Sequence, residues 1–142
     1  MEIKVYEYLP TAAKNIRKIV FIAEQGFENE FDDIDNIAKH IVIYEDNIAI
    51  GTCRIFYNNE RKYYQIGRIA IIKEYRGKGY GNILLDASET EIIKNNGNII
   101  ELALQKRISH FYLKNGFTML NEKYNDEGCP HIWMKKIINN NL

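Results

Sequence analysis

Apolar and polar residues alternate at the start of the chain and then recur at a helical period. Ile3 and Val5 begin the alternation, which predicts a strand over residues 3–8. From Thr11, which is expected to cap a helix, apolar residues recur three and four positions apart as far as Gly26. The apolar positions of this predicted helix are Ala12, Ile16, Ile19, Val20 and Ala23.

The middle of the chain has the pattern of an antiparallel meander. Two apolar runs, residues 41–44 and 48–57, flank a short polar turn and predict a hairpin. A third strand is expected over residues 62–72, before a glycine-rich stretch at 77–81 and a helix over 83–93. A meander that leads into a helix indicates a fold of mixed composition.

The last part of the chain adds a buried strand and a second small hairpin. The strand is expected over residues 99–104, followed by a short helix at 109–113. Two further strands are expected near 117–122 and 132–136. We therefore predict a single α/β (α+β) domain over residues 1–142, with helices flanking a mixed, mostly antiparallel sheet of six or seven strands.

Composition and charge exclude several functional classes. The 19 basic and 19 acidic residues cancel, so no overall field draws the chain to nucleic acid or to anionic lipid. Neither a signal peptide nor the run of roughly 20 apolar residues that a membrane span needs is apparent, so we expect a cytoplasmic protein. Cys53 and Cys129 lie in no metal-binding spacing and are interpreted as reduced thiols.

The glycine-rich stretch is the part of the sequence that indicates chemistry. Gly77, Gly79 and Gly81 follow a buried strand and precede an amphipathic helix. Glycines permit backbone conformations that turn successive N–H groups toward one point, and the positive end of the helix adds to their attraction for an anion. The stretch lacks a P-loop lysine and serine, and the meander before it is not a dinucleotide-binding βαβ unit. A different pyrophosphate ligand is therefore expected.

Two motifs resemble the GNAT superfamily of N-acetyltransferases. The run Arg76-Gly77-Lys78-Gly79-Tyr80-Gly81 matches its signature [QR]-x-x-G-x-[GA], and residues 111–117 (FYLKNGF) are similar to its later FYxKxGF stretch. Glu24-Gln25 with Asp33, Asp35, Ala38 and His40, and residues 130–134, resemble a bacterial ElaA-like subgroup. The resemblance covers nearly the whole chain.

This resemblance implies a sheet that splays between its fourth and fifth strands, expected at 62–72 and 99–104, with coenzyme A in the opening. The pantetheine arm would follow the strand, the pyrophosphate would meet backbone amides of the glycine-rich stretch, and Gln105 would replace a usual asparagine. The implied coenzyme-binding residues are Ile69, Ala70, Ile71, Arg76, Gly77, Lys78, Gly79, Tyr80, Gly81, Asn82 and Gln105.

The resemblance also implies direct transfer of an acetyl group from acetyl-CoA to a primary amine in a ternary complex. Tyr112 would protonate the departing thiolate, and Glu24 and His131 are the candidates for binding and deprotonating the amine. The acidic run 28–35 is either a solvated face or an attractor for a cationic amine. His40 and His110 are interpreted as structural or exposed, because no second ligand lies at metal-binding spacing.

Several alternatives remain open from the sequence. The acetyl acceptor is expected to be a small molecule or a peptide amine, and a homodimer is left open. A non-catalytic coenzyme A-binding or sensing module would have the same motifs, since a fold alone does not establish turnover. A second alternative is a nucleotide-binding or nucleic-acid-linked protein that uses the glycine-rich stretch for other phosphates, which the neutral charge and the missing P-loop residues oppose.

Overall fold

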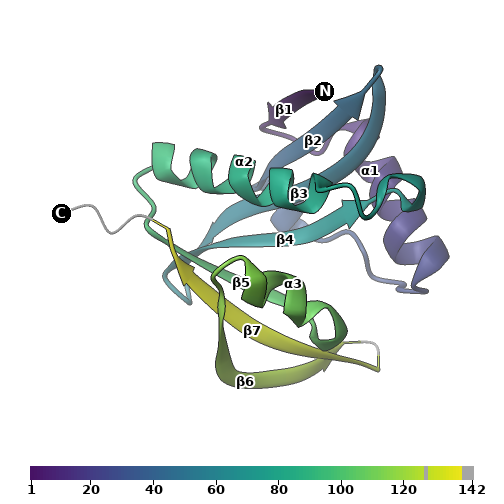
Figure 1. Cartoon of the computed structure of the whole chain (residues 1–142). Helices are drawn as coiled ribbons and strands as arrows, with labels where there is room; N and C mark the ends of the chain where they lie inside the picture. Colours follow the sequence, from purple (N-terminus) through teal and green to yellow (C-terminus); the bar gives the residue numbers. More distant parts are fainter. Residues whose placement is uncertain (127, 139–142) are drawn as a thin grey trace.

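One mixed sheet runs through the part of the chain that the computed structural model describes, residues 1–126 and 128–138, with only the backbone described at 121–126 and 129. Seven strands of this part pair in the order β1-β2-β3-β4-β5-β7-β6 (Figure 1). Neighbouring strands are antiparallel except for the parallel pair β4 and β5. The strands are β1 Glu2–Tyr6, β2 Lys39–Glu45, β3 Ile48–Asn58, β4 Tyr63–Ile71, β5 Ile99–Gln105, β6 Thr118–Asp126 and β7 Cys129–Ile137.

This sheet confirms the predicted fold class, and the differences lie at the ends of strands. The first strand stops at Tyr6, before the predicted end. The last two strands extend through polar residues into the segment predicted as a loop, because β6 and β7 pair as a hairpin. Backbone pairing carries a strand through residues whose side chains give no periodic signal.

The predicted first helix has two parts. The α-helix α1, Thr11–Arg17, continues as a π-helix over Lys18–Glu24. Pro10 rather than Thr11 occupies the N-cap position, and no side chain caps this end, so the predicted threonine cap is wrong. The other α-helices are α2 Tyr80–Lys94 and α3 Ser109–Lys114.

Helices α1 and α2 cover opposite faces of the sheet (Figure 1). Alternation along β2 separates the two cores, because successive side chains of a strand point to opposite faces. Ile41 and Ile43 belong to the core that contains Leu84 of α2. Val42 lies between them in sequence and belongs to the core that contains Ile16 of α1.

The parallel strands β4 and β5 pair at one end and separate at the other. Their backbone pairs are Tyr64 with Ile100 and Gln65 with Glu101, whereas both strands continue beyond these pairs. The buried carboxylate of Glu101 holds the closed end, since it accepts hydrogen bonds from Gln65 Nε2 at 3.0 Å and from Arg61 Nη2 at 3.1 Å. No other described residues of β4 and β5 pair with each other, which agrees with the opening that the family resemblance implied between these strands.

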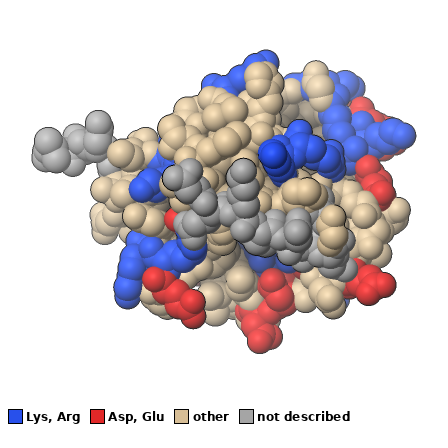
Figure 2. Space-filling model, turned by 90° about the horizontal axis from the view of Figure 1, so that it is seen from below, with Lys and Arg blue, Asp and Glu red and all other residues tan. Residues whose placement is uncertain are grey.

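The surface carries both signs of charge. Lysine and arginine side chains and aspartate and glutamate side chains both appear on the face seen from below (Figure 2), consistent with the zero net charge of the chain. Of the helices that the structure describes, none has the length and apolar character needed to cross a membrane.

Candidate active site

The glycine-rich stretch forms an open turn before α2. Gly77 has φ +75° and Gly79 has φ +88°, the left-handed region that favours glycine. Apart from the adjoining chain, no described atom lies within 4 Å of a Cβ built on either residue, so both positions face open space. Gly79 is the N-cap of α2, whose first-turn N–H groups have no acceptor within the helix. The turn therefore has the geometry of the predicted anion cradle.

The third glycine has a different reason to be small. Gly81 lies inside α2, and a Cβ there would come within 3.1 Å of Phe111 Cζ. The expectation that Gly81 helps to turn the backbone is therefore wrong, because its missing side chain admits the ring of Phe111 against the helix. This contact joins the two sequence motifs in space.

The charged side chains of the turn bind to the protein itself. Arg76 donates from Nε to Ile71 O at 2.8 Å and from Nη2 to Glu24 Oε1 at 2.9 Å. The ammonium of Lys78 lies 5.5 Å from the centre of the Tyr75 ring. The hydroxyl of Tyr80 donates to the Glu45 carboxylate, and this hydrogen bond raises the pKa of Tyr80 to about 12.

The first of two pockets in the described part of the chain, and the larger of them, lies between β4 and the segment that follows β5. Its volume is about 450 Å³. All the coenzyme residues expected from the sequence line it, except Lys78. The structure thus brings the end of β4, the glycine turn and Gln105 to one cavity, as the resemblance implied. The lining residues that the sequence reasoning missed are Val20, Phe21, Gln25, Tyr75, Arg107, Ile108 and Phe111.

Two of the missed residues could have been found from the motifs. Phe111 begins the FYLKNGF stretch, and Arg107 follows Gln105 by two positions. Gln105 donates from Nε2 to Gln25 Oε1 and accepts at Oε1 from Arg107 Nε, the latter at 2.8 Å. No periodic signal connects Gln25 with Gln105, because they are 80 residues apart in the chain.

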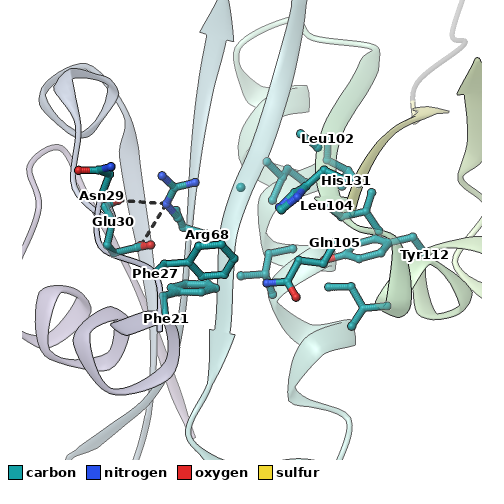
Figure 3. A pocket seen from close by; sticks show the side chains of 15 residues that line it. Phe21, Phe27, Asn29, Glu30, Arg68, Leu102, Leu104, Gln105, Tyr112 and His131 are labelled. Atoms are coloured by element: carbon teal, nitrogen blue, oxygen red, sulfur yellow. Dashed lines mark hydrogen bonds and ion pairs between the residues drawn. The ribbon is translucent and has the colours of Figure 1, made fainter. Parts of the chain in front are cut away.

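A smaller pocket, of about 80 Å³, lies between residues 66–69 of β4 and residues 102–105 of β5 (Figure 3). Arg68, Glu30 and Phe27 lie on one side of it, and His131 and Tyr112 lie on the other. The residues that line both pockets are Phe21, Ile69, Gln105, Ile108 and Tyr112. The two pockets therefore meet beside Tyr112.

Tyr112 is buried at this junction, with 4% of its surface exposed. Its ring contacts Phe111 and Phe117 edge to face, with centroids 5.0 Å and 5.7 Å away. Burial, and next the nearby Cys53 thiol, raise the pKa of Tyr112 well above its usual value of 10. Tyr112 is therefore a neutral phenol throughout the physiological pH range and has a proton to donate.

The two candidates for handling the amine lie in different places. His131 is buried, lines the smaller pocket, and has its ring centre 6.4 Å from that of Phe27. Glu24 is at the end of the π-helix, bonds to Arg76 and lines neither pocket. The geometry thus brings His131 to the smaller pocket, whereas it places Glu24 beside the glycine turn.

The expectation of a solvated face holds for only part of the acidic run, because Glu30 and Asp35 are buried whereas its other carboxylates are exposed. Asp35 accepts from Arg17 Nη1 at 2.7 Å and from Arg54 Nη1 at 2.9 Å, deep in the protein. Glu30 accepts from Arg17 Nε at 2.8 Å, and Asp32 accepts from Arg54 Nη1 at 2.7 Å. Buried carboxylates need such partners, and periodicity does not reveal them.

The other expected structural residues agree with their assignments as far as they are described. His40 is buried and donates from Nε2 to Asp35 O at 3.0 Å, so it supports the same segment. Cys53 is buried against Ser88, with Sγ 3.2 Å from Oγ, and burial raises the pKa of its thiol to about 12. The side chain of Cys129 lies outside the described part.

A bulge in β4 sets the wall between the pockets. Thr52 pairs with Ala70 and Arg54 with Gly67, so Arg68 and Ile69 together face a single residue of β3. Arg68 has φ 51°, which is uncommon for a residue with a side chain. Such bulges re-aim side chains near active sites. This one directs Arg68 and Ile69 into the opening, and no signal in the sequence indicated it.

Comparisons with known proteins agree with this arrangement. Residues 9–138 match the family model described as an acetyltransferase (GNAT) domain. YjcF of Bacillus subtilis, named an uncharacterized N-acetyltransferase, is 32% identical over 124 residues, which cover 85% of this chain and 87% of YjcF. The Escherichia coli ElaA crystal structure is similar with a TM-score of 0.83 and 25% identity, covering 95% of this chain and 98% of ElaA.

A more distant structure has the same fold. An aminoglycoside 6'-N-acetyltransferase complexed with coenzyme A is similar with a TM-score of 0.79 and 13% identity, over 100% of this chain and 99% of that chain. The predicted likeness to ElaA and its relatives is thus confirmed in sequence and in structure.

Proposed function

Because the chain belongs to the GNAT acetyltransferase family, and is therefore an acyltransferase, we propose that it transfers the acetyl group of acetyl-CoA to a primary amine. The observation that carries the proposal is the junction of two pockets at one buried tyrosine, Tyr112. A transferase needs two substrates to meet at one point, and effective positioning supplies much of the rate.

The larger pocket fits a coenzyme. Its volume of about 450 Å³ lies within the usual range of roughly 300–1,000 Å³ for cofactor sites. The open turn at Gly77 and Gly79 leaves room for a pyrophosphate beside the amino end of α2. Residues 69–71 of β4 lie beyond its backbone pairs with β5, so a pantetheine arm would add to this edge like a strand. A neighbour of the same fold that binds coenzyme A supports this assignment.

The residues around the junction support direct transfer. Acetyl-CoA supplies an activated thioester. The hydroxyl of Tyr112 would donate a proton to the departing sulfur, and a backbone N–H near Ile71 would stabilise the charge that develops on the carbonyl oxygen. The amine must lose a proton before it attacks, because a lysine-like amine has a pKa near 10.4. We assign this task to His131, directly or through water, since it lines the smaller pocket.

Two measurements test the proposal. Calorimetry should detect tight binding of acetyl-CoA and weak binding of ATP, and a thiol-release screen over an amine library should detect acceptor-dependent turnover. Tight acetyl-CoA binding without turnover on any amine would favour the non-catalytic coenzyme A module. Equal or tighter binding of ATP would refute the assignment of the glycine turn to coenzyme A.

A further inference from the structure

Arg68 presents part of its guanidinium to the smaller pocket, which we assign to the acetyl acceptor. Its Nε lies 3.0 Å from Glu30 Oε2 and donates to Glu30 O at 3.2 Å. Its Nη2 has a looser ion pair with Asp32 Oδ2 at 3.5 Å, and neither Nη1 nor Nη2 donates a hydrogen bond within the described part of the chain. Figure 3 shows the side chain at the pocket wall, joined to Glu30 through one edge. Two terminal nitrogens therefore remain able to donate to a ligand.

Glu30 has a carboxylate oxygen that is available as a hydrogen-bond acceptor beside the donors of Arg68. Its Oε2 receives both arginine contacts, from Arg17 at 2.8 Å and from Arg68 at 3.0 Å, whereas no hydrogen bond from the described part reaches Oε1. The fully buried side-chain polar atom that lacks a partner in this part is Arg54 Nε alone. Oε1 therefore keeps some accessible surface, and since Glu30 lines the smaller pocket, this oxygen is available to accept from a ligand there.

The surrounding charges are balanced before any ligand enters. Three guanidinium groups and three carboxylates form the network, and four of these six side chains are no more than 5% exposed. The six side chains of the network are those of Arg17, Arg54, Arg68, Glu30, Asp32 and Asp35. A lone ammonium or a lone carboxylate would add an uncompensated charge to this buried site, which is costly. A ligand that carries both charges would add none.

The other walls of the smaller pocket combine apolar side chains with the polar groups of Asn29, Gln105 and His131. Phe21 and Phe27 lie on the side of Arg68 and Leu104 lies on the side of Tyr112 (Figure 3), and Ile108 also lines the pocket. An acceptor with a compact zwitterionic end could therefore pack an apolar remainder against these apolar side chains.

We propose that the acetyl acceptor is an α-amino acid with an apolar side chain, whose carboxylate binds Arg68 and whose α-amine binds Glu30 Oε1. This inference rests on the proposed transferase function and names its substrate class. In the reaction, a bond forms between the α-nitrogen and the acetyl carbon while the carbon–sulfur bond breaks. The α-ammonium gives up two protons in all, one replacing the proton that Tyr112 donates to the sulfur and one passing to solvent.

The test compares acceptors that differ only at the carboxylate. We would measure kcat/KM for leucine, leucinamide and 3-methylbutylamine with acetyl-CoA. Leucine should exceed the other two by roughly 10- to 100-fold, the effect of one hydrogen bond to a charged group. In Arg68→Asn this preference should fall to about one. Asparagine tolerates the left-handed backbone at position 68, so the substitution adds little strain. Arg68→Lys should retain part of the preference, because it keeps the charge and loses the fork.

Two controls make the result decisive. Lys94→Gln removes an exposed cation at the far end of α2 and should keep the leucine preference. Calorimetry with acetyl-CoA shows that each variant is folded. If the unmodified protein acetylated leucinamide and 3-methylbutylamine as well as or better than leucine, the inference would be overturned and the transferase function would stand. A leucine preference that survives in Arg68→Asn would overturn the role of Arg68. If the protein acetylated neither these three compounds nor any other amine, both the proposed function and the inference would be refuted.

Discussion

Replacing Asp35 by asparagine should destabilise the protein strongly, although Asp35 touches neither pocket. Its side chain is 5% exposed and accepts from Arg17 Nη1 at 2.7 Å, Arg17 Nη2 at 3.1 Å and Arg54 Nη1 at 2.9 Å. Asparagine has almost the same shape, so the substitution removes the charge and leaves the packing nearly intact. Arg17 would then lose its shortest ion pair, and Arg54 would depend on Asp32 alone.

The expected loss of unfolding free energy is about 3–5 kcal/mol, the usual cost of removing one partner from a buried ion pair. A domain of this size has a total stability of roughly 5–15 kcal/mol. The melting temperature should therefore fall by about 10–20 °C. The variant is expected to fold, but with a much reduced margin.

The pH dependence of this loss follows from the pKa of Asp35. Burial would raise the pKa, but the hydrogen bonds and charges of Arg17 and then Arg54 outweigh it and lower the pKa from 3.8 to about 2. A carboxyl whose folded pKa is lowered stabilises the fold above its unfolded pKa, and this contribution disappears as the pH falls through the folded pKa. The stability difference between wild type and Asp35→Asn should therefore be constant above about pH 5 and shrink between about pH 4 and pH 2.

Urea unfolding followed by circular dichroism measures both effects. Asp33→Asn is the matched control, since Asp33 is exposed on the same turn and should change stability by less than about 0.5 kcal/mol. If Asp35→Asn lost no more stability than Asp33→Asn at pH 7, the arginines would not depend on this carboxylate and the network argument would be refuted. A difference that stayed constant down to pH 2 would refute the cause assigned to the pKa.

Two further substitutions test the assigned site. Gly79→Val should fold but lose at least about tenfold in acetyl-CoA affinity, measured by calorimetry. The reason is that φ +88° is strained for a β-branched residue and that the new side chain would enter the open turn. Unchanged affinity would contradict the anion cradle. Tyr112→Phe should keep acetyl-CoA affinity and lose roughly 10²- to 10⁴-fold in kcat. Since the pKa of Tyr112 is raised, the wild-type rate should also persist beyond pH 10. A near-normal kcat in Tyr112→Phe would show that this tyrosine only packs against its neighbours.

The sequence by itself determined the fold class, the order of most elements and part of the lining of the larger pocket, namely the end of β4, the glycine turn and Gln105. Period-two and helical patterns identify elements because each element buries one face, and Gly77 and Gly79 identify a turn because few other residues accept positive φ. The two motifs, 34 residues apart at Gly77 and Phe111, indicated one site because the family places them together. These features are local in the chain, so a linear pattern can reveal them.

Only the tertiary structure decided the role of the acidic run and the character of the smaller pocket. Glu30 and Asp35 resemble surface residues in the sequence, and their partners Arg17, Arg54 and Arg68 are distant along the chain. A pattern of hydrophobicity cannot show which opposite charge meets a carboxylate across the sheet. The bulge that turns Arg68 into the opening likewise comes from a register shift against β3, and pairing between strands decides such a shift because neither strand specifies it alone.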